Sequence, residues 1–371
     1  MNHPYDRFST SVERLIEQAV DDPDVLAVKY TIYRTSGDSP MVPAVIRAVE
    51  QGKQAVVLVE LKARFDEARN LGWARALERA GVHVVHGFPE LKTHAKCALV
   101  VRREHGGIRR YVHIGTGNYH PRTARLYTDA GLFTCRPEIA ADVSDLFNYL
   151  TGFGRPQRYR KLLVAPTDLR ERIIEEVRRV TADAAAGGQG RIVLKMNGLV
   201  DRPVIESLYE ASQAGVQVDL VVRSICCLRP GVPGLSENIR VVSVLGRFLE
   251  HERLYTFHGA ESRYFLGSAD MMPRNLDSRV EVLVPVEDRA LQSELDTLLE
   301  TSLSDNRSSF QLLPDGTWER RRPAPGEPER AAQEELMARA LEAASVDDDG
   351  GREKAAERVV RAAKRRKEDL A

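Results

Sequence analysis

The sequence predicts an α/β fold made of two similar halves followed by a tail. Strand-like and helix-like segments alternate as far as about residue 310, which is typical of a sheet covered by helices. The run AVVLVEL at residues 55–61 is apolar except for Glu60, as expected of a strand that is buried on both faces. The same order of segments returns after residue 155. The repetition predicts two domains of one architecture, related by a pseudo-twofold axis.

In the first half, residues 1–155, glycines mark the ends of the predicted helices. A helix-like segment at 42–52 ends at Gly52, and an amphipathic segment at 69–81 ends at Gly81, which is a common way for a helix to stop. Strands are predicted at residues 55–61, 82–87 and 96–102, and another runs from residue 109 into a glycine turn that ends at 119.

In the second half, residues 156–314, the same kinds of segment follow a proline-containing connector at 155–169. Helices are predicted at residues 170–188 and 202–215, and strands at 216–224, 239–245, 253–259 and 262–270. Beyond Pro314 the residues are mainly Ala, Glu and Arg, with no aromatic side chain after Trp318. We expect this tail, residues 315–371, to be helical or disordered and to take no part in catalysis.

The overall charge excludes a general attraction to polyanions. The 371 residues contain 54 Lys and Arg and 54 Asp and Glu, so any site for a polyanion must be built from local basic clusters. No apolar run approaches the roughly 20 residues of a membrane span, and the start does not read as a signal peptide. The four cysteines show no metal-binding spacing and are expected to be free thiols. We therefore expect a cytoplasmic protein with no specific nucleic-acid partner and no transmembrane segment, and leave open a peripheral association with the inner membrane.

A short motif of histidine and cation occurs once in each half. His94 and Lys96 stand two residues apart where an apolar strand begins, and His251 and Arg253 stand two apart at the corresponding place. Ten residues separate each histidine from the matching valine of the preceding strand. Because residues i and i+2 of a strand point to the same face, each histidine is expected to project beside its cation.

Each motif is followed by a small-residue turn and then by an acid. The turns IGTGNY and LGSADM place Asn118 where the second half has Asp270, and eleven residues later each half has a carboxylate, Asp129 or Glu281. One such set would be weak, whereas two sets with matching offsets indicate a site. The alternative is a structural repeat whose turn glycines serve only the fold.

Paired histidines and cations suit phosphoryl chemistry. If the halves pack about a twofold axis, His94 and His251 face each other across a cleft. Lys96, Arg253 and the N–H groups of the turns can then surround a phosphoryl group. One unprotonated imidazole can attack phosphorus, while the other protonates the leaving oxygen or stabilises charge. The two carboxylates are plausible partners for the second ring nitrogens, where they would fix the tautomer.

These residues resemble known families. Paired histidine–cation motifs with a glycine turn resemble the phospholipase D superfamily, so we expect two phospholipase D-like domains. The usual motif has an aspartate shortly after the lysine, whereas here the lysine is followed by CALVVRR, and the second motif has Arg253. A phosphodiesterase of that kind therefore remains an alternative that these departures disfavour.

A narrower resemblance is to the histidine-phosphorylating family of bacterial polyphosphate kinases. The blocks ARFDEARN and HIGTGNYHPRTARLYTD closely resemble its two C-terminal domains, and the likeness runs from about residue 2 to 315. It implies that His94 accepts the γ-phosphoryl group of ATP and passes it reversibly to polyphosphate, with His251 as the second essential histidine. It also implies that Tyr127 and Arg223 contact the nucleotide.

The same resemblance places Arg34 and Arg64 at the phosphate and Mg²⁺ site. Since a guanidinium has no lone pair to give a metal, we expect both to bind phosphate oxygens, and Mg²⁺ to arrive on the ATP phosphates. Members of the family carry two further domains upstream and are expected to be homo-oligomers. The remaining alternative is that the chain is a truncated, non-catalytic module that binds polyphosphate.

Overall fold

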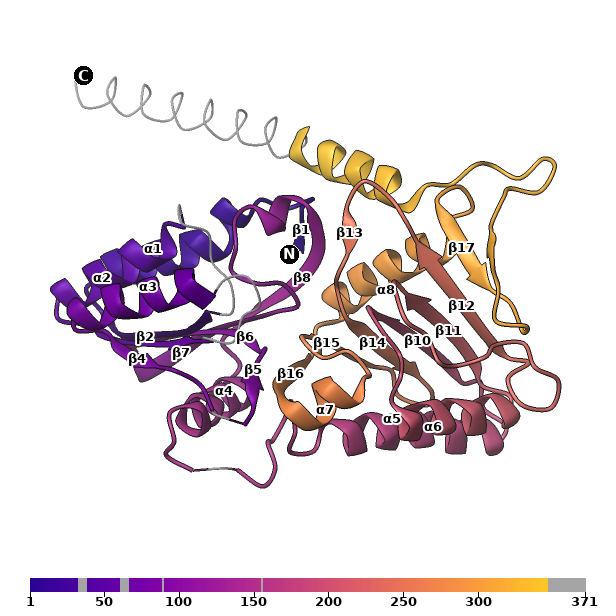
Figure 1. Cartoon of the computed structure of the whole chain (residues 1–371), viewed down its shortest axis with the longest axis horizontal. Helices are drawn as coiled ribbons and strands as arrows, with labels where there is room; N and C mark the ends of the chain where they lie inside the picture. The colour runs from indigo at the N-terminus through magenta and orange to yellow at the C-terminus, as the bar shows by residue number, and fades with distance from the viewer. Residues whose placement is uncertain (33–38, 61–66, 89, 155, 346–371) are drawn as a thin grey trace, which may run out of the picture.

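The structure is a computed structural model that describes residues 1–32, 39–60, 67–88, 90–154 and 156–345. Two halves lie side by side, the first coloured indigo to purple and the second pink to orange (Figure 1). Each half is built on a mixed sheet with helices on its faces. The predicted α/β class with two related domains is therefore confirmed.

The sheet of the first half has the order β1-β8-β7-β6-β2-β3-β4. The strands β2, β3 and β4 at one end of the sheet are parallel, and the remaining pairs in this order are antiparallel. The strands are β1 (Asn2–His3), β2 (Val25–Ile32), β3 (Gln54–Val59), β4 (His83–Val85), β6 (Lys96–Glu104), β7 (Gly107–Gly115) and β8 (Tyr127–Thr134). The helices are α1 (Val12–Asp21), α2 (Met41–Glu50), α3 (Glu67–Arg79) and α4 (Pro137–Leu150), with short 3₁₀ turns η1 (Phe8–Thr10) and η2 (Thr123–Arg125).

The second half repeats this topology. β10, β11 and β12 are parallel, and β14, β15, β16 and β9 continue antiparallel in the same sense as β6, β7, β8 and β1. The strands are β9 (Leu163–Ala165), β10 (Arg191–Met196), β11 (Gln217–Val222), β12 (Ile239–Val244), β14 (Leu254–His258), β15 (Arg263–Gly267), β16 (Arg279–Pro285), β17 (Ser309–Leu312) and β18 (Trp318–Arg320). The helices are α5 (Leu169–Ala185), α6 (Arg202–Gln213), α7 (Pro273–Ser278) and α8 (Arg289–Ser304).

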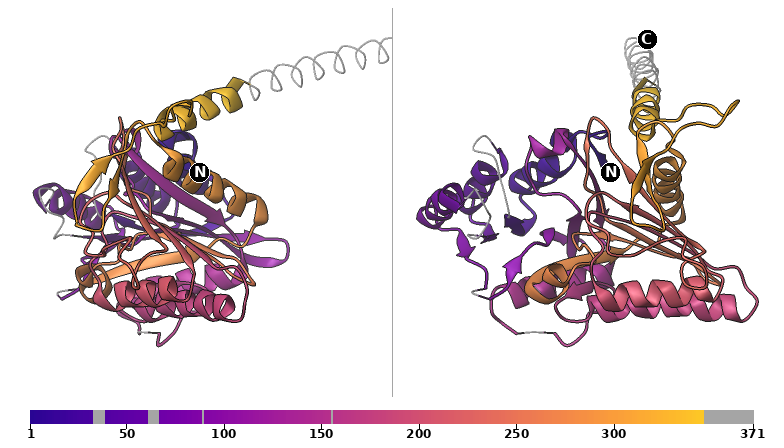
Figure 2. Two further views of the ribbon diagram at one scale, coloured as in Figure 1. Left: turned by 90° about the vertical axis from the view of Figure 1, so that its right-hand side faces the viewer. Right: turned by 45° about the vertical axis from the view of Figure 1, so that its right-hand side comes forward.

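The two halves share one hydrophobic core. α1, α2 and α3 pack on the outer face of the first sheet, and α5 and α6 on the outer face of the second (Figures 1 and 2). Between them, Val143 and Phe147 of α4 and Leu295 and Leu299 of α8 join one cluster with strands of both sheets. Full burial of such a side chain stabilises the fold by about 1.5–3 kcal/mol, so the core fixes the halves relative to each other.

Two short strands cross between the halves. β5 (Lys92–Thr93) belongs to the first half but pairs in parallel with β16 of the second, and β13 (Leu249–Glu250) of the second half pairs in parallel with β8 of the first. Each crossing strand directly precedes one of the paired histidines. The exchange is reciprocal, as a twofold relation between the halves requires.

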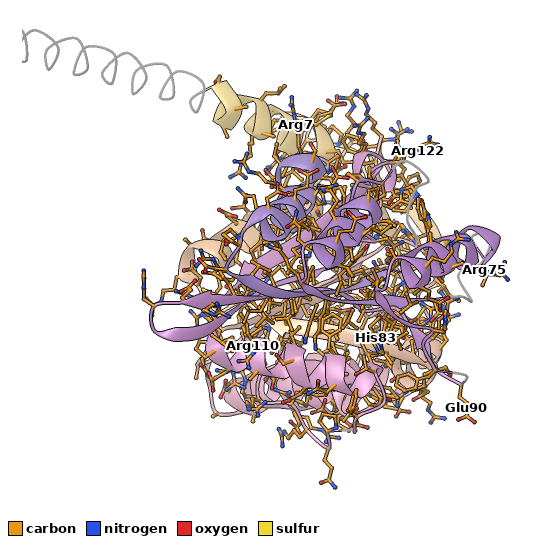
Figure 3. All side chains as sticks on the ribbon, turned by 90° about the vertical axis from the view of Figure 1, so that its left-hand side faces the viewer. Arg7, Arg75, His83, Glu90, Arg110 and Arg122 are labelled. Carbon is orange, nitrogen blue, oxygen red and sulfur yellow. The ribbon has the colours of Figure 1, made fainter. Side chains whose placement is uncertain are left out.

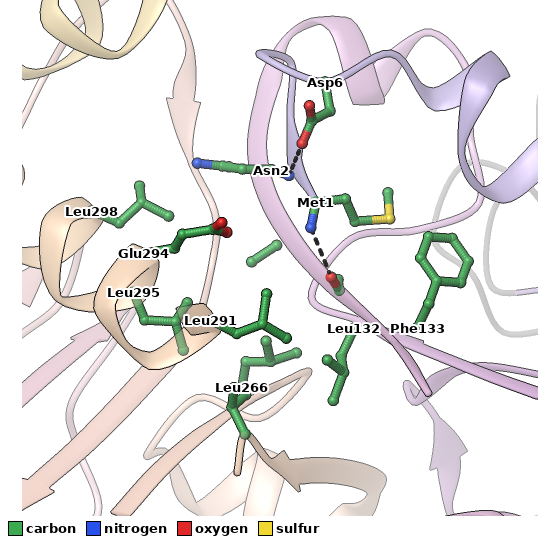
Figure 4. A pocket seen from close by; sticks show the side chains of 13 residues that line it. Met1, Asn2, Asp6, Leu132, Phe133, Leu266, Leu291, Glu294, Leu295 and Leu298 are labelled. Atoms are coloured by element: carbon green, nitrogen blue, oxygen red, sulfur yellow. Dashed lines mark hydrogen bonds between the residues drawn. The ribbon is translucent and has the colours of Figure 1, made fainter. Parts of the chain in front are cut away.

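A cavity of about 250 Å³ lies between the halves next to this exchange (Figure 4). Its walls are mainly apolar, with Leu132 from β8 on one side and Leu291, Leu295 and Leu298 from α8 on the other. The cavity is bordered by residues 130–133 of β8, directly after Asp129. The helix α8 and the strand β8 are therefore not packed tightly along their whole length.

The described part of the predicted tail packs on the second half. β17 and β18 extend the second sheet beyond β12. A helix over residues 332–345 follows, drawn in yellow on the side opposite α5 and α6 (Figure 2). Ala332 and Gln333 at its start are buried. Of the helices in the described ranges, none is both long enough and apolar enough to cross a membrane.

Candidate functional site

The crossing strands bring each histidine to the acid of the opposite half. In the β5–β16 pair, Val280 lies opposite Thr93, so the next residues are His94 and Glu281. In the β13–β8 pair, Thr128 lies opposite Glu250, so the next residues are His251 and Asp129. The sequence predicted that these acids partner the histidines. The register shows that the partners are exchanged between the halves.

His94 is held on both its backbone and its ring. Its N–H donates to the carbonyl oxygen of Val280 at 2.9 Å, and its Nδ1 lies 2.9 Å from Oε2 of Glu281. The other oxygen of Glu281 accepts a hydrogen bond from Nδ2 of Asn275 at 2.7 Å. His94 is 7% exposed and Glu281 is fully buried. The carboxylate therefore fixes the ring orientation, with Nε2 as the ring nitrogen that does not contact it.

His251 has the corresponding arrangement with Asp129. The distance from Nδ1 of His251 to Oδ1 of Asp129 is 2.7 Å, and the same oxygen accepts a hydrogen bond from Oγ1 of Thr116 at 2.6 Å. Gly117 lies against this carboxylate: a Cβ atom there would stand 2.2 Å from Oδ2 of Asp129. The glycine of the predicted turn is thus needed because the carboxylate occupies the space of a side chain.

Lys96 and Arg253 lie beside the two histidines. Nζ of Lys96 donates to the carbonyl oxygen of His94 at 2.5 Å. Nη1 of Arg253 donates to the carbonyl oxygen of His251 at 2.7 Å and lies 3.2 Å from its Nε2. Arg253 also forms a bidentate pair with Asp270, with distances of 3.3 and 3.1 Å. A buried lysine and a buried arginine therefore lie beside the two histidines, as expected of a site for an anion. Burial lowers the pKa of Lys96, whereas Asp270 raises that of Arg253 against the effect of burial.

The surroundings keep both imidazoles neutral near pH 7. Burial lowers the pKa of His94 well below its ordinary value, and Lys96, Arg279 and Arg253 lower it further. Burial also lowers the pKa of His251, opposed by Asp129 and reinforced by Arg253. Lys96 contributes to both shifts. The two rings thus share one cationic environment, and an unprotonated ring is what a nucleophile requires.

The two acids differ in the direction of their pKa shifts. Burial raises the pKa of Glu281 to about 7, although Lys96 acts against the shift. For Asp129, burial also favours the protonated form, but the neighbouring His251 and the hydrogen bond from Thr116 outweigh it, so the pKa is lowered. Asp129 is therefore a carboxylate at neutral pH, whereas Glu281 is only partly ionised near pH 7.

Other predicted residues surround this centre. The ring of Tyr127 lies 5.2 Å from that of His251, centroid to centroid. Nη1 of Arg223 donates to the carbonyl oxygen of Glu250 at 2.9 Å. Asn118 is partly exposed, and its Oδ1 is a buried atom with no hydrogen-bond partner among the residues that the structure describes. Arg34 and Arg64 lie outside the described residues.

Sequence reasoning missed Arg279. It precedes Glu281 by two residues on β16, as Tyr127 precedes Asp129 by two on β8, and it lowers the pKa of His94. The offset used to align the two acids would have found it. By contrast, His83 is exposed on the edge strand β4 (Figure 3), which β2 and β3 separate from β6, the strand of Lys96. It provides a matched control for experiments on His94.

The arrangement defines the class of protein. Two related α/β halves, each with a histidine, a basic side chain and an acid, have the fold of two phospholipase D-like domains. Neutral imidazoles can act in attack and proton transfer, and buried basic side chains can stabilise a phosphoryl group. The aspartate that usually follows the first motif is replaced by apolar and basic residues.

Comparison with known proteins gives the family. Residues 1–156 match the family model "Polyphosphate kinase C-terminal domain 1", and residues 162–333 match "Polyphosphate kinase C-terminal domain 2". The chain belongs to the polyphosphate kinase family. It is 58% identical over 342 residues to the polyphosphate kinase of Thermosynechococcus vestitus, covering 92% of this chain and 47% of that protein. It is 62% identical over 318 residues to that of Mycobacterium avium, covering 86% and 43%.

The solved structures agree. The polyphosphate kinase of Porphyromonas gingivalis superposes with a TM-score of 0.85 at 38% identity, covering 92% of this chain and 52% of that one. A phosphatidylserine synthase from Haemophilus influenzae covers 92% of both chains with a TM-score of 0.54 at 12% identity, and shares the fold alone. The chain thus spans about half the length of the polyphosphate kinases that it matches.

Proposed function

We propose that this chain is a catalytic core that transfers the γ-phosphoryl group of ATP reversibly to inorganic polyphosphate through a phosphohistidine at His94. The observation that carries the proposal is the exchange of partners, which joins two neutral histidines and two buried cations in one centre. Membership of the polyphosphate kinase family supports the choice of substrates.

In the first step, Nε2 of His94 attacks the γ-phosphorus of ATP. A nitrogen–phosphorus bond forms, the bond from phosphorus to the bridging oxygen breaks, and ADP leaves with the electron pair. The carboxylate of Glu281 keeps the ring proton on Nδ1, so that the lone pair stands on Nε2. Lys96 and Arg253 stabilise the charge on the phosphoryl oxygens.

In the second step, a terminal oxygen of polyphosphate attacks the phosphohistidine and the nitrogen–phosphorus bond breaks. His251, oriented by Asp129, is the acid–base group at this face: its neutral ring takes the proton of the attacking phosphate oxygen, and the protonated ring then stabilises the negative charge. Tyr127 and Arg223 border this side of the centre and are assigned to the nucleotide, and Asn118 to a phosphate.

Mg²⁺ is assigned to the substrate. Within the described residues, no group of three or more His, Cys, Asp or Glu side chains is placed to hold a metal ion. We therefore assign Mg²⁺ to the ATP phosphates, and Arg34 and Arg64 to phosphate oxygens. We also assign the protein to the cytoplasm, with at most a peripheral contact with the inner membrane, and expect a homo-oligomer, which light scattering on the purified chain would test.

The test of the proposal is phosphoenzyme formation. Incubation with γ-³²P-labelled ATP and Mg²⁺ should give a protein label that is stable in base and labile in acid, and polyphosphate should discharge it. His94→Ala should abolish the label, whereas His83→Ala, an exposed histidine of the same half, should keep it. Cleavage of a phosphodiester without a labelled protein would favour the phosphodiesterase. Polyphosphate binding that persists in His94→Ala, without formation of ADP, would favour a non-catalytic module.

A further inference from the structure

The helix over residues 332–345 holds the loop that leads to His251. Its second residue, Gln333, is 5% exposed. Oε1 of Gln333 accepts a hydrogen bond from the N–H of Phe248 at 2.8 Å, and Nε2 donates to the carbonyl oxygen of Phe248 at 2.9 Å. Nε2 also donates to Oε1 of Glu250 at 2.6 Å. The amide thus binds the residue just before β13 and the last residue of β13.

The loop is shaped to receive this amide. A Cβ atom at Gly246 would lie 2.4 Å from Oε1 of Gln333, so the absence of a side chain at Gly246 makes room for the contact. The helix itself is fixed from below: the N–H of Ala332 donates to Oδ2 of Asp305 at 2.8 Å, and Leu336 packs against the core shared by both halves.

A buried chain of charged groups continues from Gln333 to the histidine. Oε2 of Glu250 lies 2.6 Å from Nζ of Lys195, and the same Nζ lies 2.9 Å from Oε1 of Glu252. Oε2 of Glu252 accepts hydrogen bonds from the N–H of His251, at 3.2 Å, and from Oγ1 of Thr128. Thr128 immediately precedes Asp129, the partner of the imidazole.

Because these charged groups are buried, they hold a fixed arrangement. Glu250, Lys195 and Glu252 are each at most 7% exposed, and a buried charge left without its partner costs several kcal/mol. The contacts are therefore expected to persist together or be lost together. A shift of the loop at Phe248 would displace both the backbone of His251 and the strand that carries Asp129.

We propose that Gln333 is a positioning residue for His251, and that the start of the helix over residues 332–345 helps to align this histidine with Asp129. The inference rests on the proposed function for its kinetic consequence, but the contact and the ring orientation can be tested without turnover. It assigns a role to a segment that the sequence marked as a tail without catalytic importance.

The first test is Gln333→Met, which keeps a side chain of similar length but removes all three hydrogen bonds. Because a displacement of about 1 Å at a reacting group can cost about 100-fold in rate, we expect kcat to fall by about 10–100-fold with little change in the KM for ATP. Glu334→Met is the matched control, since Glu334 is exposed on the same turn and should leave kcat within about twofold.

The second test is the Nδ1–H resonance of His251 in protein labelled selectively at histidine. In the unsubstituted protein, the short contact with Asp129 should move this proton far downfield, and Gln333→Met should weaken or remove the signal. Gly246→Ala should act in the same direction, because it presses on the amide from the loop side while leaving the helix unchanged. Thermal unfolding should show that the variants remain folded.

The outcomes separate the two proposals. If the unsubstituted protein forms no phosphoenzyme but Gln333→Met changes the His251 resonance, the positioning role stands and the proposed function fails. If a folded Gln333→Met protein retains both kcat and the resonance, the positioning role is overturned. If Gln333→Met does not fold, Gly246→Ala decides between the same two results.

Discussion

His94 and His251 occupy equivalent positions in the two halves, but different side chains surround them. His94 faces a glutamate whose pKa burial raises to about 7, whereas His251 faces an aspartate whose pKa is lowered by His251 and by its hydrogen bonds, against the effect of burial. The cation beside His251 is tied to Asp270, and the first half has Asn118 in the corresponding place. The topology thus supplies two similar frames, and the residues within them make the two histidines chemically different.

The supports behind the two histidines differ as well. The buried groups behind His251 are Lys195, Glu250 and Glu252. By the register of the strands, the first half has Thr31, Thr93 and Ala95 at these positions. There the hydroxyl of Thr31 donates to the carbonyl oxygen of Ala95 at 2.7 Å, and no charged triad is formed by those three residues. The uncharged side chains behind His94 suit a ring whose charge changes when it is phosphorylated. The fixed ionic groups behind His251 suit a ring that must keep its contact with Asp129.

Replacing each histidine in turn should give the largest difference between the halves. We expect His94→Gln to form no phosphoenzyme at any time, because glutamine cannot replace the attacking nitrogen. We expect His251→Gln to form it but to pass the phosphoryl group to polyphosphate about 10²–10⁴-fold more slowly, which is the usual cost of losing an acid–base group. Rapid-quench measurement of labelled protein after mixing with γ-³²P-labelled ATP, and of its discharge after addition of polyphosphate, tests both.

Equal loss of label in the two variants would contradict this assignment of roles, and a label that persists in His94→Gln but disappears in His251→Gln would reverse it. Circular dichroism should show that both variants are folded, since the shared core does not depend on either ring.

The sequence predicted much of this site because the signal was doubled. The matching offsets from histidine to turn to acid identified Asp129 and Glu281, and each lies within 3 Å of a histidine nitrogen, at 2.7 and 2.9 Å. The alternation of apolar and helical segments likewise predicted α2, β3, α3, α6 and β11 to within a few residues. Because these features depend on residues close together in the sequence, residue spacing and hydrophobic periodicity can predict them.

The exchange between the halves could not be predicted in the same way. β5 and β13 are two residues long, too short to show a period, and their pairing depends on how the halves dock. Gln333 was missed for a similar reason: a glutamine in an Ala- and Glu-rich helix has the composition of a surface residue. Its hydrogen-bond partners, Phe248 and Glu250, are distant in the sequence and reach it only through the fold.

The pH dependence of the two acids sharpens the comparison further. Phosphorylation of His94 should speed up as pH rises through about 7, because the ionised form of Glu281 is the one that keeps the proton on Nδ1. Glu281→Gln should lower the rate by up to about 10⁴-fold through the wrong tautomer and remove this rise. Asp129→Asn should slow the reaction but leave the rise in place, since Asp129 is already ionised throughout that range.

The measurement is the single-turnover rate of labelling between about pH 6 and 8. A rise near pH 7 that survives in Glu281→Gln would show that another group controls the ionisation. Loss of the rise in Asp129→Asn would mean that the two acids act as one unit rather than separately.

The smallest expected effect is on stability. The contributions of the two acids to the free energy of unfolding should change with pH in opposite directions. The pKa of folded Glu281 is raised from 4.5 to about 7, so folding favours its protonated form. That stabilisation is complete below the unfolded pKa and is lost as pH rises through about 7. The pKa of folded Asp129 is lowered, so its contribution is present above the unfolded pKa and is lost only on acidification.

Between about pH 5 and 8, the free energy of unfolding should therefore fall by about 1–3 kcal/mol relative to that of Glu281→Gln, in which the titrating group is absent. Over the same pH range, the difference in the free energy of unfolding between the unsubstituted protein and Asp129→Asn should stay nearly constant. Urea unfolding of the three proteins at the two pH values measures both differences. A pH-independent gap between the unsubstituted protein and Glu281→Gln would show that Glu281 does not titrate in this range, and would remove the electrostatic distinction between the two histidines.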